Sequence, residues 1–204
     1  MSSTQPEIQV ENPFDPGYLT TEDLLGLGFK RVGQNVRIAK NCTIIGLPNI
    51  SIGSNIRIDG NTVLAAHSGY LEIGNYIHIA GGCHLSCAGG IQLSDFCNLS
   101  QGVRIYSASD DYTGASLTNP TVPSQYLKVQ KAPVQLGRHL IVGSGSVILP
   151  GTSIGDGASI GALSLVNRSL EGWSIYAGIP VRRIRARSKD LLELERHLTD
   201  QTES

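Results

Sequence analysis

Residues 105–114 of this 204-residue chain read IYSASDDYTG and contain side chains that can move protons. Asp110 and Asp111 are adjacent carboxylates, and a carboxylate either accepts a proton itself or orients a histidine that does so. The chain has five histidines. In a histidine–aspartate pair the carboxylate sets the imidazole tautomer and stabilises the imidazolium ion. The residue types therefore predict acid–base chemistry here, if the fold brings a histidine to this segment.

An aliphatic residue returns every six positions on both sides of the segment. A six-residue period is neither helical nor a simple alternation, and it is typical of short strands joined by tight turns, three to a coil. The aliphatic residue points inward and glycine serves the corners. We therefore predict an all-β chain, a parallel β-helix of six coils. The repeat residues are Val32, Ile38, Ile44, Ile52, Ile58, Leu64, Ile73, Ile79, Leu85, Leu93, Leu99, Ile105, Leu136, Val142, Ile148, Ile154, Ile160 and Val166.

The third segment of each of the first four coils is overlong. Segments 44–51, 64–72 and 85–92 carry small bulges, and residues 106–135 form one long loop. If the register is right, every insertion leaves the solenoid at the same corner. Loops of this length in compact domains usually serve binding or catalysis, so we predict that this corner carries the binding site. Neutral insertions at a tolerant corner remain the alternative.

The ends of the solenoid need covers, because an open β-helix end is an unpaired sheet edge. TTEDLLGLGF (20–29) predicts a short capping helix with Thr21 as its N-cap, and SKDLLELERHL (188–198) predicts an amphipathic helix that opens at Ser188. The chain thus divides into an N-terminal arm with a capping helix (1–31), the β-helix (32–171) and a C-terminal tail with a helix (172–204).

Composition excludes several classes of function. The net charge of −1 gives no general attraction for nucleic acid or for an anionic membrane. No apolar run approaches the roughly 18 residues of a membrane span, and the N-terminus lacks the basic and apolar regions of a signal peptide. We expect a soluble cytoplasmic protein. Its 24 glycines and 5% aromatics indicate a narrow core of aliphatic side chains.

The four cysteines do not form a metal or disulfide pattern. Cys42, Cys83 and Cys97 each fall four places after a repeat aliphatic, which is a small inward position, so we expect them in the core. Cys87 falls in a bulge, and we expect it to be exposed. No paired CxxC spacing occurs, so no metal is expected.

Two later stretches resemble a known family. VGSGSVILPGTSIGDGASIGALSLV (142–166) and WSIYAGIPVRRIRAR (173–187) resemble the C-terminal half of hexapeptide-repeat acyltransferases. The resemblance covers roughly 30–187 and is closest to the sugar acetyltransferases: galactoside and maltose types, and those that modify nucleotide-linked or polysaccharide sugars. It implies a left-handed β-helix and a homotrimer with active sites between neighbouring subunits. It also implies transfer of an acetyl group from acetyl-CoA to a sugar hydroxyl or amine, as in lipopolysaccharide O-antigen biosynthesis.

The chain departs from this family at the general base. In the galactoside and maltose enzymes the loop starts with a pattern like IYTATHP, whose histidine is the base. The matching stretch here is IYSASDD, so Asp110 stands at that position. An aspartate with its ordinary pKa near 4 is a poor base for a sugar hydroxyl. If the acceptor is an amine, a weaker base suffices, and Asp110 then orients the acceptor or pairs with its ammonium group.

The base is otherwise sought among the histidines. His84 directly precedes Leu85 as Arg104 precedes Ile105 one coil later, so His84 is predicted under the start of the loop, within reach of Asp110 or Asp111. The resemblance also places 82–88 in the acceptor-binding wall. His139 and His78 are the alternative bases.

The remaining site residues divide between acceptor and donor. Tyr112, Asn119 and Tyr126 of the loop offer hydrogen bonds to an acceptor, with Cys87 nearby. The resemblance implies that the later coils line a pantetheine groove and that the basic tail grips the phosphates of coenzyme A. The donor residues are Ser144, Ser146, Gly161, Ala162, Gly178, Arg182, Arg183 and Arg185. The arginines are alternatively the solvated start of the final helix.

Two other functions fit the same fold. A non-catalytic binding or scaffold trimer that lost its base at position 110 is one. A γ-class carbonic anhydrase, with zinc held by histidines such as His67, His78 and His84, is the other. Against the latter, His78 and His84 are expected at different corners of one coil, and the AGIP-plus-arginine tail would be unexplained.

Overall fold

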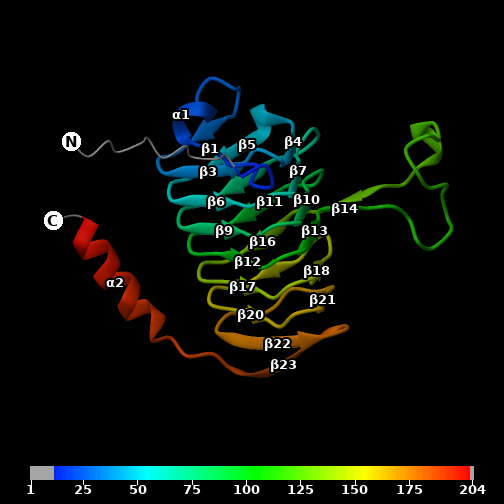
Figure 1. Ribbon diagram of the computed structural model, residues 1–204. Coiled ribbons are helices and arrows are strands. Elements are labelled where there is room, and N and C mark those ends of the chain that lie inside the picture. The colour runs from blue at the N-terminus through cyan, green and yellow to red at the C-terminus, as the bar shows by residue number, and fades with distance from the viewer. Residues whose placement is uncertain (1–11, 203–204) are drawn as a thin grey trace, which may run out of the picture.

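The computed structural model describes residues 12–202 and forms a solenoid with three flat faces (Figure 1). Each face is one sheet, and the chain visits sheets B, A and C in turn in every coil. Sheet B contains β2 (Arg31–Val32), β5 (Ile50–Ile52), β8 (Leu71–Ile73), β11 (Ile91–Leu93), β16 (Val134–Leu136) and β19 (Ser153–Ile154). Sheet C contains β4 (Thr43–Ile45), β7 (Val63–Ala65), β10 (His84–Ser86), β13 (Arg104–Tyr106), β18 (Val147–Ile148) and β21 (Leu165–Val166).

Sheet A is the longest and closes both ends of the solenoid. It contains β1 (Tyr18–Leu19), β3 (Val36–Ala39), β6 (Ile56–Ile58), β9 (Ile77–Ile79), β12 (Asn98–Leu99), β17 (Ile141–Val142), β20 (Ser159–Ile160), β22 (Ser174–Gly178) and β23 (Val181–Ala186). β22 continues the parallel stack on β20, and β1 and β23 pair antiparallel at the two ends. The predicted left-handed β-helix is confirmed. Sheet A continues beyond the six complete coils. β22 lies in the predicted C-terminal tail (172–204) but stacks on β20 as part of a seventh coil.

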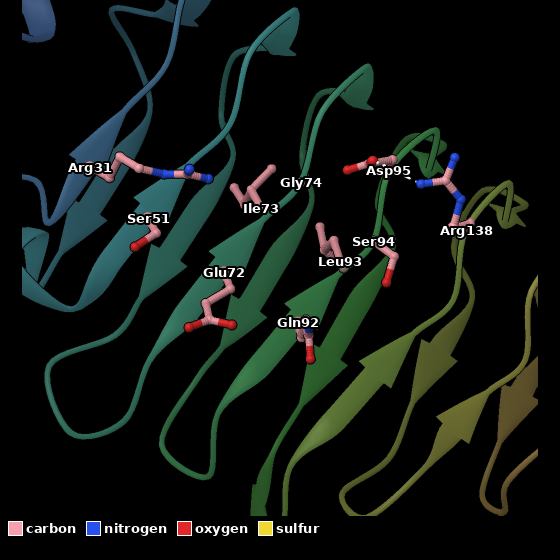
Figure 2. A pocket seen from close by; sticks show the side chains of 10 residues that line it. All are labelled: Arg31, Ser51, Glu72, Ile73, Gly74, Gln92, Leu93, Ser94, Asp95 and Arg138. Atoms are coloured by element: carbon pink, nitrogen blue, oxygen red, sulfur yellow. Dashed lines mark hydrogen bonds and ion pairs between the residues drawn. The ribbon is translucent and has the colours of Figure 1, made fainter. Parts of the chain in front are cut away.

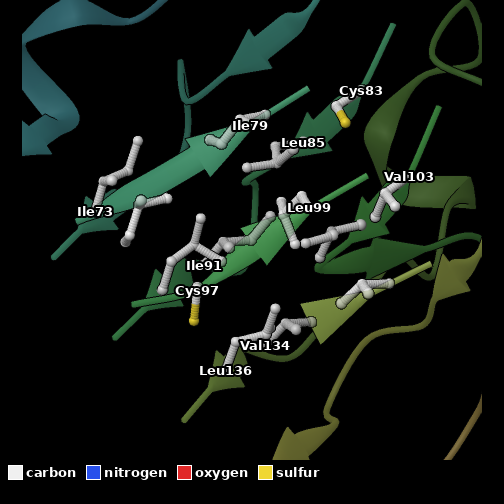
Figure 3. Close-up of a cluster of buried hydrophobic side chains, with 14 of the residues drawn as sticks. Ile73, Ile79, Cys83, Leu85, Ile91, Cys97, Leu99, Val103, Val134 and Leu136 are labelled. Atoms are coloured by element: carbon white, nitrogen blue, oxygen red, sulfur yellow. The ribbon is translucent and has the colours of Figure 1, made fainter. Parts of the chain in front are cut away.

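The repeat residues form one continuous aliphatic core (Figure 3). Ile58, Ile79 and Leu99 follow one another in register on sheet A, and each is 0% exposed. Cys83 and Cys97 lie in the same core, as predicted. Coils approach so closely that a Cβ on Gly53 would lie 2.2 Å from the carbonyl oxygen of Gly74. The six-residue period therefore works because each inward side chain stacks on its equivalent in the next coil.

Every insertion leaves at one corner, between sheets C and B, as predicted. The short helix η1 (Leu47–Asn49) occupies the first bulge. The long loop begins as a two-stranded ribbon, with β14 (Ala108–Ser109) antiparallel to β15 (Gln130–Lys131), and includes η2 (Ser124–Tyr126). In Figure 1 this loop projects well away from the solenoid. The corner thus carries an extended arm.

Both terminal helices begin at other residues than expected. Helix α1 (Thr21–Leu24) has Thr20 as its N-cap, because the backbone N–H of Thr20 donates to Asp23 Oδ2 at 2.9 Å. Helix α2 (Leu191–Thr202) starts three residues after Ser188, whose hydroxyl oxygen accepts from the backbone N–H of Asp190. No helix in the described part of the chain is long and apolar enough to cross a bilayer. Residues 1–11 of the predicted arm lie outside the described residues.

Cys87 is buried, contrary to prediction. Cys87 is two residues after the inward Leu85, so it also points inward: its backbone N–H extends the ladder to Ala65 O at 2.8 Å, and the residue is 0% exposed. Cys87 therefore cannot reach an acceptor from this position.

The buried thiols are expected to resist alkylation in the native protein. Burial raises the pKa of Cys83 to about 11 and those of Cys87 and Cys97 to about 12. Iodoacetamide at pH 8 attacks thiolates, so we expect these three to stay unmodified while the half-buried Cys42 reacts first. Peptide mass mapping, with urea-unfolded protein as the control, checks the order. Early modification of Cys87 would show that its bulge opens.

Candidate functional site

His78 and His84 flank one corner of the third coil. We call the turn from each sheet A strand to the following sheet C strand the A–C corner. His78 lies on β9 before this corner and His84 on β10 after it, and both side chains point outward because their neighbours Ile79 and Leu85 fill the core. In the fourth coil the corner begins at Ser100. The two histidines therefore lie on different faces but border the same corner, so the prediction that they occupy different corners is wrong.

His84 lies where the sequence predicted it. It pairs with Arg104 in the next coil, directly below the start of the loop. Its ring lies 5.9 Å from the Tyr106 ring, centroid to centroid. Across residues 12–202 no carboxylate contacts His84, so the predicted link to Asp110 or Asp111 does not form within one chain.

His78 has the carboxylate partner that His84 lacks. Its Nε2 lies 2.8 Å from Oδ2 of Asp59, one coil away. Asp59 also accepts hydrogen bonds from Tyr18 and Arg57. Burial alone raises the pKa of Asp59, but these hydrogen bonds outweigh it and hold the pKa below its usual value. An ionised Asp59 fixes His78 as an Nε2–H donor and leaves its Nδ1 free for another group.

His139 is unavailable as a base. It is 9% exposed, its ring stacks on Phe96 at 4.8 Å, and its Nε2 lies 2.7 Å from Oε2 of Glu195. Glu195 also pairs with Arg138, so helix α2 is held against the turn from sheet B to sheet A by two neighbouring basic residues. His139 attaches the C-terminal helix, and its candidacy as a catalytic base is wrong for this reason.

The two loop aspartates differ sharply. Asp110 is exposed, and its carboxylate has no partner among residues 12–202. Asp111 accepts hydrogen bonds from the backbone and hydroxyl of Thr113 and from the Ser116 hydroxyl. The hydroxyl of Thr113, followed by the other donors, lowers the pKa of Asp111 to about 2. Asp111 shapes the loop, and only Asp110 offers a free carboxylate.

The other predicted loop residues lie far out on the arm. Tyr112 is 93% exposed and Tyr126 is 53% exposed. The side-chain oxygen of Asn119 accepts from the backbone and hydroxyl of Thr121, so it forms a turn and only its amide nitrogen is free. These side chains point at no surface of their own subunit.

The donor residues gather on the A–C corner. Ser144, Ala162 and Gly178 follow one another at this corner in successive coils, beside Gly161. Leu163 and Ile179 add apolar side chains that are 70% and 73% exposed. This edge of small residues and exposed apolar groups suits a narrow, partly apolar chain such as pantetheine. Ser146 does not belong to it, because its hydroxyl is buried and donates to the Gly161 carbonyl at 3.0 Å.

The predicted arginines lie on a strand, not on the final helix. β23 folds back along β22 and places Arg182 beside Ala177, next to the A–C corner. Arg183 donates to the Ser174 hydroxyl at 3.0 Å. Arg182 and Arg185 are exposed and have no partner in the described chain. The strand thus holds the free guanidinium group of Arg182 at the end of this edge, a group type that suits a phosphate, while Arg185 lies opposite Ile175, nearer the start of β22.

Two grooves lie on the outer faces of the early coils. The larger, about 480 Å³, runs over sheet B past Arg31, Glu72 and the Asp95–Arg138 ion pair (Figure 2). The smaller, about 330 Å³, lies on sheet A and is lined by Asn35, Arg37, Asn55, Ile56, Arg57, Tyr76, Ile77 and His78.

Sequence reasoning missed the outward row of sheet A. Arg37, Arg57, His78 and Asn98 stand in register on four successive coils. The amide oxygen of Asn98 is the one buried side-chain nitrogen or oxygen of the described residues without a hydrogen-bond partner. Ser100, at the next corner, was also missed. The sequence could have revealed this row, because each of its residues directly precedes an inward repeat aliphatic and must therefore point outward.

Comparisons with known proteins place the chain in a family. No family model matches the chain. It is 43% identical, over 87% of its length and 93% of the relative's, to a dTDP-4-amino-4,6-dideoxy-D-glucose acyltransferase of Escherichia coli. It is also similar to AntD, an N-acyltransferase from Bacillus cereus solved with dTDP and 3-hydroxybutyryl-CoA. That similarity has a TM-score of 0.87 and 40% identity and covers 92% of this chain and 99% of that one.

Further structures of the Bacillus cereus protein contain dTDP-4-amino-4,6-dideoxyglucose with coenzyme A. They include variants at a serine and at an aspartate ten residues after it in that chain. A more distant relative, 26% identical over 78% of this chain and 88% of its own length, is the putative lipopolysaccharide O-acetyl transferase WbbJ of Escherichia coli K12. With its solenoid, its donor edge and these relatives, the chain belongs to the hexapeptide-repeat family of acyl-CoA-dependent sugar acyltransferases.

Proposed function

We propose that the protein transfers a short acyl group from coenzyme A to the amino group of a dTDP-linked 4-amino-4,6-dideoxyhexose, a precursor of a surface polysaccharide. The amine nitrogen attacks the thioester carbonyl carbon, a C–N bond forms, and the C–S bond breaks. The nitrogen loses a proton to a protein base, and the coenzyme leaves as a thiol after taking up a proton. This conclusion rests on the 43% identity to a relative that acts on such a sugar and on one side chain, Asp110.

Asp110 suits an amine better than a hydroxyl. A neutral amine attacks without prior deprotonation, and the nitrogen becomes strongly acidic only as the new bond forms. A carboxylate is basic enough to take that proton and also orients the ammonium form of the acceptor. The O-acetyltransferase pattern carries a histidine at this position. The exchange for a free, exposed carboxylate therefore favours N-acylation.

Ser100 is the second residue that we assign to the reaction. The variants of the Bacillus cereus relative alter a serine and an aspartate ten residues apart. Two serine–aspartate pairs of this chain have that spacing: Ser100 with Asp110, and Ser146 with Asp156. Ser146 is buried and bonded to a carbonyl, whereas Ser100 lies at the A–C corner between His78 and the donor edge. This placement supports Ser100 as a hydrogen-bonding residue at the meeting point of acceptor and thioester.

The proposal includes a homotrimer in which the loop of one subunit covers the A–C corner of the next. The arm exposes Tyr112, Leu117, Tyr126 and Val129. The outer face of sheet C has apolar side chains at its two ends. Ile45, which is 48% exposed, lies beside Ala65 at one end, and Val147 lies beside Leu165 at the other. His84 and Arg104 lie between these two groups. Exposed apolar surface of this extent indicates a protein interface. Such an assembly brings Asp110 to Ser100 of the neighbour.

Turnover tests the function directly. We expect coenzyme A release when dTDP-4-amino-4,6-dideoxyglucose is offered with acetyl-CoA or 3-hydroxybutyryl-CoA, and an N-acyl product by mass spectrometry. dTDP-glucose, which lacks the amine, is the matched control and should give no product. His84→Ala should retain most of the activity, because a carboxylate and not His84 takes the proton. Acylation of dTDP-glucose would move the function to O-acylation, and absence of any turnover would favour a non-catalytic trimer.

A further inference from the structure

We infer that the groove on sheet A, over the first three coils, binds the diphosphate and base of the nucleotide-linked acceptor. The inference rests on the proposed function and names the part of the chain that recognises the nucleotide. None of the residues involved belongs to the loop or to the donor edge.

The groove holds unused hydrogen-bond donors of positive charge. Arg37 is exposed, and within residues 12–202 its guanidinium group donates to no acceptor. Arg57 donates its Nε to Asp59 at 2.7 Å, and its side chain also interacts with the Tyr18 hydroxyl. A guanidinium group has five N–H donors, so donors remain for a ligand. The two arginines occupy the same register on neighbouring strands, about 4.8 Å apart along the solenoid. Two guanidinium groups at this spacing suit the paired phosphates of a nucleoside diphosphate.

Tyr18 and Asp59 hold these arginines in place. The guanidinium carbons of Arg37 and Arg57 lie 5.7 Å and 5.8 Å from the centre of the Tyr18 ring. The Tyr18 hydroxyl donates to Asp59 at 2.7 Å, and this bond raises the pKa of Tyr18. Preorganised cations lose less conformational freedom when an anion binds. Asp59 is the one acid at the groove, and its oxygens are already occupied by Arg57, Tyr18 and His78.

The opposite wall offers groups that bind a base. Tyr76 presents an aromatic ring whose one face stacks on Phe96, at 4.9 Å and with 3° between the planes. Beside it, Asn35 and Asn55 point amides along the same edge, linked by a 2.8 Å hydrogen bond from Asn35 Nδ2 to Asn55 Oδ1. Rings and amides recognise bases by stacking and by hydrogen bonds to base edges. Phosphate and base subsites therefore lie on the two sides of one groove.

The groove leads to the reaction centre. The outward row continues from Arg57 through His78 to Asn98, two coil spacings or about 10 Å further along. Asn98 has a buried amide oxygen with no hydrogen bond to lose, so its side chain can turn toward a sugar at no cost in bonding. Ser100 follows at the corner. A diphosphate on the arginines thus directs the attached sugar toward Asn98 and Ser100.

The larger groove on sheet B is less suited to a diphosphate. Its Arg138 is paired with Asp95 and with Glu195 of helix α2. Its Glu72 has no partner in the described chain and lies between Ser51 and Gln92 on the outward row, where it repels phosphate (Figure 2). Only Arg31 is free, so the groove carries one unpaired cation beside one unpaired acid.

Calorimetric titration of the full-length protein with dTDP, and separately with coenzyme A, tests the inference. Arg37→Gln and Arg57→Gln should each weaken dTDP binding at least about tenfold, the value of one charge-assisted hydrogen bond. Coenzyme A binding should not change. Arg31→Gln, in the sheet B groove, is the matched control and should bind dTDP like the wild type. Arg37→Lys keeps the charge and should recover part of the affinity.

Steady-state kinetics separate this inference from the proposed function. The aminosugar nucleotide is varied while the acyl-CoA is kept saturating. Under these conditions Arg37→Gln should keep most of its kcat while its KM for the aminosugar nucleotide rises about tenfold. Unchanged dTDP affinity in Arg37→Gln and Arg57→Gln would overturn the subsite, although wild-type turnover would leave the function standing. A loss confined to Arg31→Gln would place the nucleotide on sheet B and also overturn it. A wild-type protein that binds coenzyme A but neither binds dTDP nor acylates the aminosugar would overturn the function itself.

Discussion

Asp110→Asn is expected to lower kcat for aminosugar acylation by about two to four orders of magnitude, the usual contribution of a general base. Asparagine keeps the size and the hydrogen-bonding reach of the side chain but takes no proton and does not attract an ammonium group. Because Asp110 is exposed and unpaired within its own subunit, the change should leave folding and coenzyme A binding intact. Single-turnover acyl transfer at saturating substrates measures the step directly.

Asp111→Asn is the matched control for this experiment. Its carboxylate is held by Thr113 and Ser116, and its pKa of about 2 lies below the ordinary value of 3.8. The lowered pKa means that Asp111 supports the loop above about pH 4 and loses this role only as the pH falls toward 2, so it stays ionised in any assay. We expect a moderate effect through loop geometry. A loss in Asp111→Asn as large as that in Asp110→Asn would contradict the assignment of the base to Asp110.

Ile79→Ala is expected to reduce the free energy of unfolding by about 2–5 kcal/mol. Ile79 is 0% exposed and stacks between Ile58 and Leu99 in neighbouring coils, so the truncation leaves a cavity in the narrowest part of the core. Urea unfolding at a fixed protein concentration measures the change, since association with other subunits would add stability. Leu194→Ala, on the 68% exposed side chain of α2, should change stability by less than about 0.5 kcal/mol.

An Ile79→Ala protein as stable as Leu194→Ala would contradict the reading of the repeat as the source of stability. A cavity in a solenoid acts on two interfaces at once, because each coil contacts only its neighbours. We therefore expect hydrogen exchange to quicken first in the coils on either side of β9.

The proposed binding mode places the two substrates on one line. In it the diphosphate lies over Arg37 and Arg57, the sugar near Asn98 and Ser100, and the acyl chain along Ser144 and Ala162. In the proposed trimer the two substrates would meet end to end at the A–C corner, and the neighbour's Asp110 would approach from outside. The donor edge also depends on a glycine that lets neighbouring coils approach closely. A Cβ on Gly143 would lie 2.4 Å from the backbone nitrogen of Ala162 and would push the coils apart.

The solenoid itself was determined by the sequence alone. A side chain that recurs every six residues must return to the same face of each coil, so the inward rows, the six coils and the common corner of the insertions all follow from spacing. The register of His84 under Arg104 was predicted correctly for the same reason. These features depend on contacts between adjacent coils, and the period encodes such contacts.

Which polar side chains are free was decided only by the tertiary structure. The His139 ring is bonded to the carboxylate of Glu195, which lies 56 positions later in the chain. The His78 ring is bonded to the carboxylate of Asp59 in the preceding coil. Cys87 is buried because the β10 strand continues into its bulge, and Ser146 turns inward to a carbonyl. A hydrogen bond requires two groups within about 3 Å in a definite orientation. Turn shape and the docking of a distant helix set that orientation, and neither is written in a six-residue period.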